Sequence, residues 1–175
     1  MRKLKNLELN RLSIEEFKNS KKTSISIILD NIRSLNNIGS IFRTADAFLI
    51  DKIYLCGITA KPPNKDIHKT ALGSTDSVNW EYHNNILDLV DSLKKTGLKI
   101  ISVEQVENST ALNSFKYEKN ANYAFVFGNE VNGISQEVIN SSDEVVEIPQ
   151  YGTKHSFNIS VSVGIVLWDI YNKIN

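Results

Sequence analysis

Three polar loops in this sequence are rich in glycine, asparagine and serine and contain side chains that could do chemistry. They span residues 30–44, 127–135 and 148–160. Each loop follows an apolar run typical of a buried strand, and open α/β sheets bind ligands at the carboxyl ends of their strands. Glycines let the backbone turn sharply or approach a ligand, while arginine, carboxylate and amide groups can hold and orient it. We therefore expect these loops to form one binding site.

Two familiar nucleotide-binding motifs are absent from the sequence. Gly128 and Gly133 have the glycine spacing of a phosphate-binding P-loop, but Ile134 occupies the position that requires lysine. No G-x-G-x-x-G dinucleotide fingerprint occurs anywhere in the chain. ATP hydrolysis and hydride transfer therefore lose their main support.

Apolar runs that alternate with helical stretches must position the three loops. Strands are expected at residues 25–29, 53–56, 78–82 (an edge strand), 99–103, 123–127 and 145–148. Helices are expected at residues 38–48, 67–72, 86–95 and 159–174. The alternation predicts an α/β fold with a mostly parallel sheet and helices on both faces, in one domain over residues 23–175.

The three loops resemble, in order and spacing, motifs 1, 2 and 3 of the SpoU/TrmH RNA 2′-O-methyltransferases, within the SPOUT superfamily. The first matching piece is Asn37-x-Gly39-x-x-x-Arg43-Thr44-Ala45. The second is Phe127-Gly128-x-Glu130-x-x-Gly133-Ile134-Ser135. The third is Ile148-Pro149-x-x-Gly152-x-x-x-Ser156-x-Asn158-x-Ser160-x-Ser162-x-Gly164-Ile165. The resemblance covers roughly residues 24–172, almost the whole chain.

The resemblance implies a fold that ordinary topology rules would not suggest, because knots are almost absent from proteins. It implies a deep trefoil knot near the C-terminus, whose loops hold S-adenosylmethionine in a bent shape. It also implies a homodimer with an active site shared between subunits. Val161, Ile165 and Trp168 lie outside the main apolar stripe of the last helix, which favours burial on several sides. Knot packing and a dimer interface would explain this; a central helix of a single chain is the alternative.

Motif 1 supplies the residue that the resemblance makes catalytic, Arg43. Because arginine is almost never deprotonated in proteins, holding the ribose and its phosphate and stabilising the 2′-oxyanion suit Arg43 better than a literal base role. A surface salt bridge is its alternative. The resemblance implies that Asn37 organises Arg43, although Asn36 or Asn37 could be a plain N-cap. Arg33 is expected to contact phosphate, or else to be an ordinary surface charge.

Motifs 2 and 3 supply the remaining site residues that the resemblance implies. Glu130 would position the substrate and support the arginine, while Ser156 and Asn158 would lie beside the cofactor and the ribose. A solvated carboxylate and simple helix caps are the alternatives. The residues implied to contact the cofactor are Phe127, Gly128, Gly133, Ile148, Gln150, Gly152, Ser156 and Phe157. The family more often has leucine where Phe157 stands.

The charges are balanced in sum and uneven in distribution. Lysine plus arginine and aspartate plus glutamate each number 20, which argues against a generic nucleic-acid-coating protein. Residues 1–22 nevertheless carry seven basic and three acidic side chains, a net charge of +4. The remaining 13 basic and 17 acidic residues give −4. We expect this leader, with one short helix begun by a Ser13–Glu16 capping box, to contribute Arg2, Lys3, Lys5 and Arg11 to RNA binding.

Several other classes of protein are disfavoured. The single cysteine, Cys56, allows no internal disulfide and no cysteine-based zinc site, which suits a reducing cytosol. The three histidines are widely scattered, and we expect no metal. The N-terminus has no apolar segment typical of a signal peptide, and no apolar run approaches membrane-spanning length. A cytoplasmic location without a membrane partner is expected.

The function predicted from the sequence is S-adenosylmethionine-dependent methyl transfer to a ribose 2′-hydroxyl of structured RNA. Transfer RNA is favoured over rRNA, because many rRNA members carry a separate N-terminal RNA-binding domain and only about 22 residues precede the first strand here. Two alternatives from other classes remain. One is a non-catalytic RNA-binding or assembly module with the same fold, and the other is a small-molecule α/β enzyme, which leaves the three-loop match unexplained.

Overall fold

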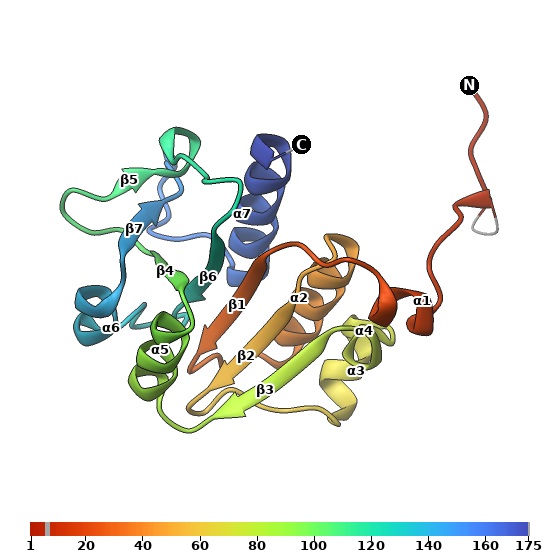
Figure 1. Ribbon diagram of the computed structural model, residues 1–175, viewed down its shortest axis with the longest axis horizontal. Helices are drawn as coiled ribbons and strands as arrows, with labels where there is room; N and C mark the ends of the chain where they lie inside the picture. Colours follow the sequence, from red (N-terminus) through yellow and green to blue (C-terminus); the bar gives the residue numbers. More distant parts are fainter. Residues whose placement is uncertain (6–7, 175) are drawn as a thin grey trace.

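Seven strands pair side by side in one sheet in the order β3-β2-β1-β6-β4-β7-β5, and every pair is parallel (Figure 1). The computed structural model describes residues 1–5 and 8–174. The strands are β1 (Ile25–Asp30), β2 (Lys52–Cys56), β3 (Asn79–His83), β4 (Leu98–Val103), β5 (Thr110–Ala111), β6 (Asn122–Phe127) and β7 (Glu144–Glu147). The helices are α1 (Ile14–Asn19), α2 (Leu35–Ala47), α3 (Lys65–Ala71), α4 (Ser74–Ser77), α5 (Ile86–Lys95), α6 (Gln136–Ser141) and α7 (Ile159–Ile174), with a 3₁₀ turn η2 (Leu112–Ser114).

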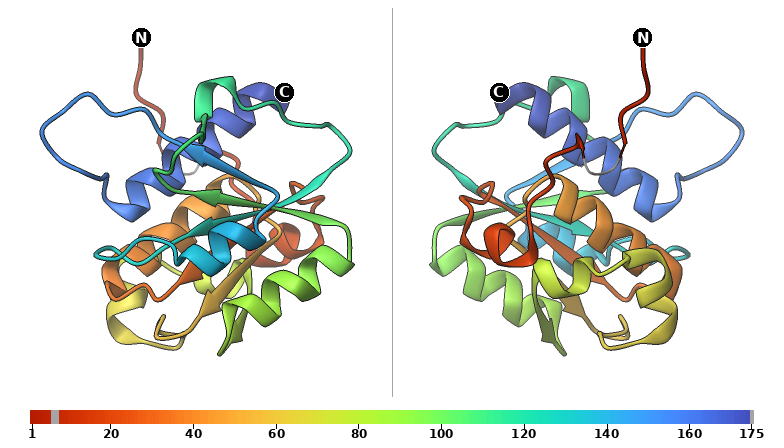
Figure 2. Two further views of the ribbon diagram at one scale, coloured as in Figure 1. Left: turned by 90° about the vertical axis from the view of Figure 1, so that its left-hand side faces the viewer. Right: turned by 90° about the vertical axis from the view of Figure 1, so that its right-hand side faces the viewer.

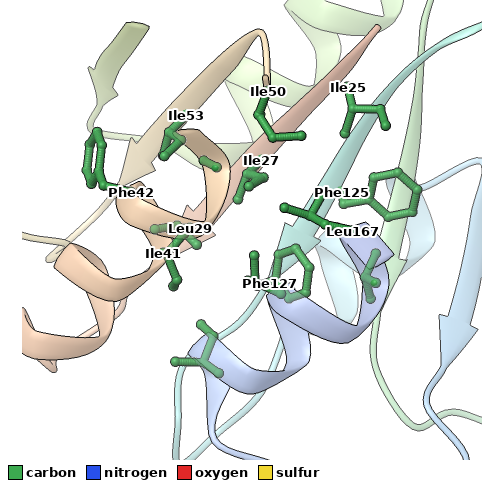
Figure 3. Packing of buried hydrophobic residues seen from close by; sticks show 14 of the residues in the cluster. Ile25, Ile27, Leu29, Ile41, Phe42, Ile50, Ile53, Phe125, Phe127 and Leu167 are labelled. Carbon is green, nitrogen blue, oxygen red and sulfur yellow. The ribbon is translucent and has the colours of Figure 1, made fainter. Parts of the chain in front are cut away.

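Both faces of the sheet are covered, as the near-continuous apolar runs of the central strands require. Ile27 and Leu29 of β1 join a core with α2, α3 and α7, whereas the intervening Ile28 joins a second core with α5 and α6. Figure 3 shows Phe42 of α2 and Leu167 of α7 on the same side of β1 and β6. Figure 2 shows the sheet and the helices on its two faces from the sides. The predicted α/β class with helices on both faces is confirmed.

Helix α2 begins one turn earlier than its apolar periodicity predicts. The side chain of Ser34 accepts a hydrogen bond from the backbone N–H of Asn37 and so caps the helix before Leu35. Neither Asn36 nor Asn37 is therefore the N-cap. The buried side chains Ile38, Ile41, Phe42 and Ala45 form the apolar stripe that fixes this helix on the sheet.

The remaining predicted elements agree closely with the structure. Residues 86–95 and 159–174 are helices with the expected bounds, and β3 lies at an edge of the sheet. The sequence analysis missed β5, α4 and α6, which have two to six residues each and are too short to show a period. Helix α1 begins with the predicted capping box, in which Ser13 and Glu16 satisfy each other's backbone N–H groups.

The N-terminal segment is largely exposed. Phe17 of α1 is its buried anchor and packs into the core with α2 and α7. The trace before α1 runs away from the sheet (Figure 1). Within residues 1–5 and 8–174, no helix combines the length and apolar character needed to cross a bilayer.

Helix α3 packs directly against Gly39 of α2, and we predict that Gly39→Ala destabilises the protein. An added Cβ would overlap the backbone carbonyl of Ile67 and the hydroxyl of Thr70, so the two helices would have to separate. Overpacking of this kind costs about 1–3 kcal/mol, more than the roughly 1 kcal/mol gained by removing a helical glycine. Urea unfolding of the wild type and of Gly39→Ala measures the difference in their free energies of unfolding. Ser40→Ala, in the same helix, is the control and should leave stability within about 0.5 kcal/mol.

Candidate active site

A cavity of about 740 Å³ lies at the carboxyl ends of β4, β6 and β7, where Val103, Phe127 and Glu147 are the last strand residues. Its volume is within the range of small-molecule sites, roughly 300–1,000 Å³. The second and third polar loops form most of its wall. All predicted cofactor residues except Gly152 line it, namely Phe127, Gly128, Gly133, Ile148, Gln150, Ser156 and Phe157. Gly152 is exposed outside the lining.

The lining has a distinct chemical character. Apolar side chains such as Ile134, Ile139 and Ile148 provide contact surface, and Glu104, Glu130 and Glu147 provide carboxylates. Among the residues that the structure describes, no lysine or arginine lines the cavity. This composition suits a ligand that joins an apolar ring to a positive charge. Over the described ranges, no cluster of three or more histidine, cysteine, aspartate or glutamate side chains is arranged to hold a metal ion.

The second loop closes on itself. The backbone N–H and C=O groups of Asn129 and Gly133 exchange two hydrogen bonds, of 3.1 and 2.9 Å. Gly133 has φ = +66°, and a Cβ on Gly128 would overlap the Gly133 backbone, so both positions require glycine. The side chain of Asn129 donates to the carbonyl of Asn31 at 2.7 Å and thus fixes this loop against the first one. Asn129 is not among the site residues predicted from the sequence.

Glu130 is a second link between these loops. Its carboxylate accepts hydrogen bonds from the backbone N–H groups of Arg33 at 3.2 Å and Ser34 at 3.3 Å. Burial alone would raise the pKa of Glu130, but these bonds, its own backbone N–H and the Asn37 side chain together lower that pKa below its usual value. Glu130 is therefore an ionised group that holds the start of α2.

Asn37 and Asn158 join the first loop to the third. The side-chain amide of Asn158 donates to the side-chain oxygen of Asn37 at 3.1 Å. The Asn158 oxygen accepts from the backbone and hydroxyl of Ser160, so Asn158 also caps the start of α7. The structure thus brings Asn37, Glu130 and Asn158 together, and Asn158 both caps α7 and lines the cavity.

Arg43 is placed differently from these three residues. It is exposed on α2 and, within the described chain, its guanidinium makes no hydrogen bond or ion pair and lines no part of the cavity. Six residues separate it from Asn37, which on an α-helix puts the two side chains about 120° apart. Asn37 therefore contacts Asn158 rather than Arg43. The salt-bridge alternative for Arg43 does not occur.

The predicted RNA-binding cations are all exposed, and only some are unpaired. Arg33, Lys3 and Arg11 make no side-chain ion pair in the part of the chain that the structure describes. Arg2 pairs with Glu8 at 2.8 Å inside the leader, which neutralises its charge locally. The backbone N–H of Lys5 also donates to Glu8.

Cys56 is unsuited to covalent chemistry. Burial, with a contribution from the nearby Asp30 carboxylate, raises the pKa of its thiol to about 12. The thiolate, which is the nucleophilic form, is therefore negligible at neutral pH.

The loop after β4 also contributes to the cavity, through Val103, Glu104, Gln105 and Val106. Sequence analysis missed this loop because it contains no glycine and matches no motif. The rule that ligands bind at carboxyl ends of strands would have indicated it.

We predict that Glu130→Gln lowers stability at pH 7, because an amide oxygen replaces a carboxylate that accepts two backbone N–H bonds. Folding lowers the pKa of Glu130, so the ionised carboxylate stabilises the fold at pH values above its unfolded-state pKa of about 4.3. This stabilisation disappears as the pH falls through the folded-state pKa. The difference in unfolding free energy between the wild type and Glu130→Gln, measured with urea, should therefore be smaller at about pH 3 than at pH 7. Glu144→Gln, an exposed carboxylate without a partner, is the control. A difference independent of pH would contradict the prediction.

Comparison with known sequences identifies the group to which these loops belong. The family model described as the SpoU rRNA Methylase family matches residues 24–168. A Borreliella burgdorferi protein named tRNA (guanosine(18)-2'-O)-methyltransferase is 28% identical over 162 residues, which cover 92% of this chain and 72% of the relative. A second protein of that organism, an uncharacterized tRNA/rRNA methyltransferase, is 30% identical over 165 residues, covering 93% of this chain and 69% of its own length.

Solved structures share the fold. The TrmH/SpoU tRNA modifying enzyme of A. aeolicus superposes with a TM-score of 0.81 at 24% identity, covering 91% of this chain and 80% of that one. An AdoMet-bound rRNA methyltransferase from Sinorhizobium meliloti gives the same TM-score and identity, covering 89% of this chain and 58% of that one. Because the family model matches residues 24–168, most of the sequence, this chain belongs to the SpoU rRNA methylase family.

Proposed function

We propose that this protein transfers a methyl group from S-adenosylmethionine to a ribose 2′-hydroxyl of structured RNA, with tRNA favoured, in the cytoplasm. The observation that carries the proposal is the joining of the three motif loops at one edge of the sheet, through Asn37–Asn158 and the links of Asn129 and Glu130 to the first loop. Similarity to the Borreliella tRNA (guanosine(18)-2'-O)-methyltransferase supports tRNA, with rRNA as the alternative substrate.

The cavity lining fits S-adenosylmethionine. Ile148, Gln150 and Phe157 would hold the adenosine through apolar and backbone contacts, and the glycines of the second loop leave room beside it. Its sulfonium charge suits a lining that has, among described residues, no lysine or arginine. When bound, S-adenosylmethionine supplies a methyl group on a positively charged sulfur that leaves as a neutral thioether.

The side chains of the site act on the ribose mainly by positioning and charge. The Arg43 guanidinium remains protonated, holds the ribose and its adjacent phosphate, and stabilises negative charge that develops on the 2′-oxygen. Asn158, fixed by Asn37, orients the hydroxyl group, and Ser156 lies beside it. Glu130 keeps the start of α2 in place. As the bond between the 2′-oxygen and the methyl carbon forms and the carbon–sulfur bond breaks, the hydroxyl proton passes to water, and no step requires a covalent enzyme intermediate.

A homodimer with a shared active site is part of this proposal. Arg43 lies outside the cavity of its own chain, so a second subunit could bring its Arg43 to that cavity. Helix α7 exposes Val161 and Trp168, at 48% and 57%, and the Trp168 ring packs against Phe48 of α2. Trp168 thus lies beside the C-terminal end of α2, the helix that carries Arg43. A purely monomeric protein in sedimentation equilibrium would contradict the shared site.

We also propose the C-terminal trefoil knot. Strand β6 lies between β1 and β4, and β7 lies between β4 and β5, so late segments are inserted among earlier ones. Helix α7 then returns to pack against α2 in the core. An experimental structure in which residues 148–158 pass outside the preceding loops would exclude the knot.

We predict that Arg43→Ala folds and binds S-adenosylmethionine but loses methyl transfer by at least about 10²-fold, because the stabilisation of the developing oxyanion is lost. Arg43→Lys should recover only part of the rate, since lysine cannot form the bidentate contact. Lys95→Ala, an exposed cation at the end of α5, is the matched control and should keep normal turnover. Near-normal turnover of Arg43→Ala would rule out the assigned role.

We predict that deletion of residues 1–22 weakens RNA binding and reduces its dependence on salt, because the leader carries a net charge of +4. Affinity for S-adenosylmethionine should be unchanged. RNA binding measured from 50 to 200 mM salt gives the slope for both proteins. An unchanged slope would place the phosphate-binding surface elsewhere.

One experiment tests the proposed function directly. The protein is incubated with labelled S-adenosylmethionine and separate tRNA and rRNA pools from cells that lack it, and 2′-O-methyl nucleosides are mapped. Label in tRNA supports the favoured substrate, and label in rRNA alone would move the assignment there. Label in neither pool, with cofactor binding intact, would favour a non-catalytic RNA-binding module.

A further inference from the structure

Two consecutive residues after β4 contact both loops that form the cavity wall. Glu104 reaches the second loop at Gly133 and Ile134, and Gln105 reaches the third loop at His155. Both residues line the cavity and lie outside the three sequence motifs.

Glu104 fixes the turn of the second loop. Its carboxylate accepts hydrogen bonds from the backbone N–H groups of Ile134 at 3.0 Å and Gln105 at 2.8 Å. It also occupies the space that a side chain on Gly133 would need, since an added Cβ there would overlap a Glu104 oxygen. The backbone of Glu104 is itself tied to Val146 of β7 at 3.0 Å. The carboxylate thus anchors a left-handed turn to the sheet.

Gln105 fixes the third loop. Its side-chain amide donates to the backbone carbonyl of His155 at 2.6 Å. Within the described chain, this is the only hydrogen bond that any of residues 149–157 makes. The two walls of the cavity are therefore both held from one point at the end of β4.

We propose that Glu104 and Gln105 are positioning residues that clamp the two cofactor-binding loops in their binding geometry. The proposal rests on the proposed function only in naming the ligand as S-adenosylmethionine. The clamp acts through loop geometry, so it supports S-adenosylmethionine and its demethylated product S-adenosylhomocysteine equally. A direct attraction between Glu104 and the sulfonium would favour S-adenosylmethionine alone.

The test combines hydrogen exchange of the free protein with calorimetric binding. In Glu104→Ala, the Ile134 amide should exchange at least about tenfold faster, because it loses a bond to a charged acceptor. Dissociation constants for S-adenosylmethionine and S-adenosylhomocysteine should rise together by about tenfold. KM for S-adenosylmethionine should rise while kcat at saturation stays near normal. Gln105→Ala should weaken both ligands several-fold and leave the Ile134 amide protected.

Two further variants make the result decisive. Glu107→Ala removes an exposed, unpartnered carboxylate from the same loop and should match the wild type in every measurement. Glu104→Gln keeps one acceptor oxygen and should lie between the wild type and Glu104→Ala, which separates the clamp from a folding defect.

Two kinds of result would contradict the clamp, and a third would contradict the proposed function. Unchanged Ile134 exchange and unchanged affinities in Glu104→Ala would overturn the clamp, as would weakened binding of S-adenosylmethionine alone. If the wild-type protein binds neither ligand, the proposed function fails, while the exchange of Ile134 still reports on the clamp.

Discussion

The central position of β6 is the constraint on which the site depends. This strand pairs with β1 on one side and β4 on the other, so the loop that follows it lies between the loops that follow its neighbours. Because all strands are parallel, these loops emerge at the same edge of the sheet. Residues 148–158 then return from β7 along this edge to α7, which packs against α2, and so bring Asn158 within hydrogen-bond distance of Asn37, 121 residues away in sequence.

The polar groups at this edge are engaged with one another before any ligand arrives. Glu130 uses its carboxylate on the backbone of Arg33 and Ser34, and Asn129 binds the carbonyl of Asn31. Such mutual satisfaction stabilises loops that have few apolar contacts, and it presets the geometry that catalysis by positioning requires. Within the described chain, the exposed guanidinium groups of Arg33 and Arg43 are not engaged in this way.

Much of the fold could be predicted from the sequence, because apolar periodicity locates long elements such as α5 and α7 with their observed bounds. Motifs 2 and 3 likewise predicted most of the cavity lining, whereas motif 1 contributes none of it. Helix α2 began earlier than predicted because one hydroxyl, that of Ser34, decides where it starts. Glu104 and Gln105 could not be found from any motif, since their role depends on which loops the chain folds beside them. The contact of Asn37 with Asn158 rather than Arg43 likewise required the three-dimensional arrangement.

The contact between Gly133 and Glu104 also limits how this sequence can vary. The two residues are 29 positions apart, yet the Glu104 carboxylate occupies the space where a Cβ on residue 133 would lie. A Cβ at position 133 would have to displace the Glu104 carboxylate, and the φ of +66° by itself disfavours any residue with a side chain there. A substitution at either position would therefore act on the other, and the two would show a coupling energy in a double-mutant cycle.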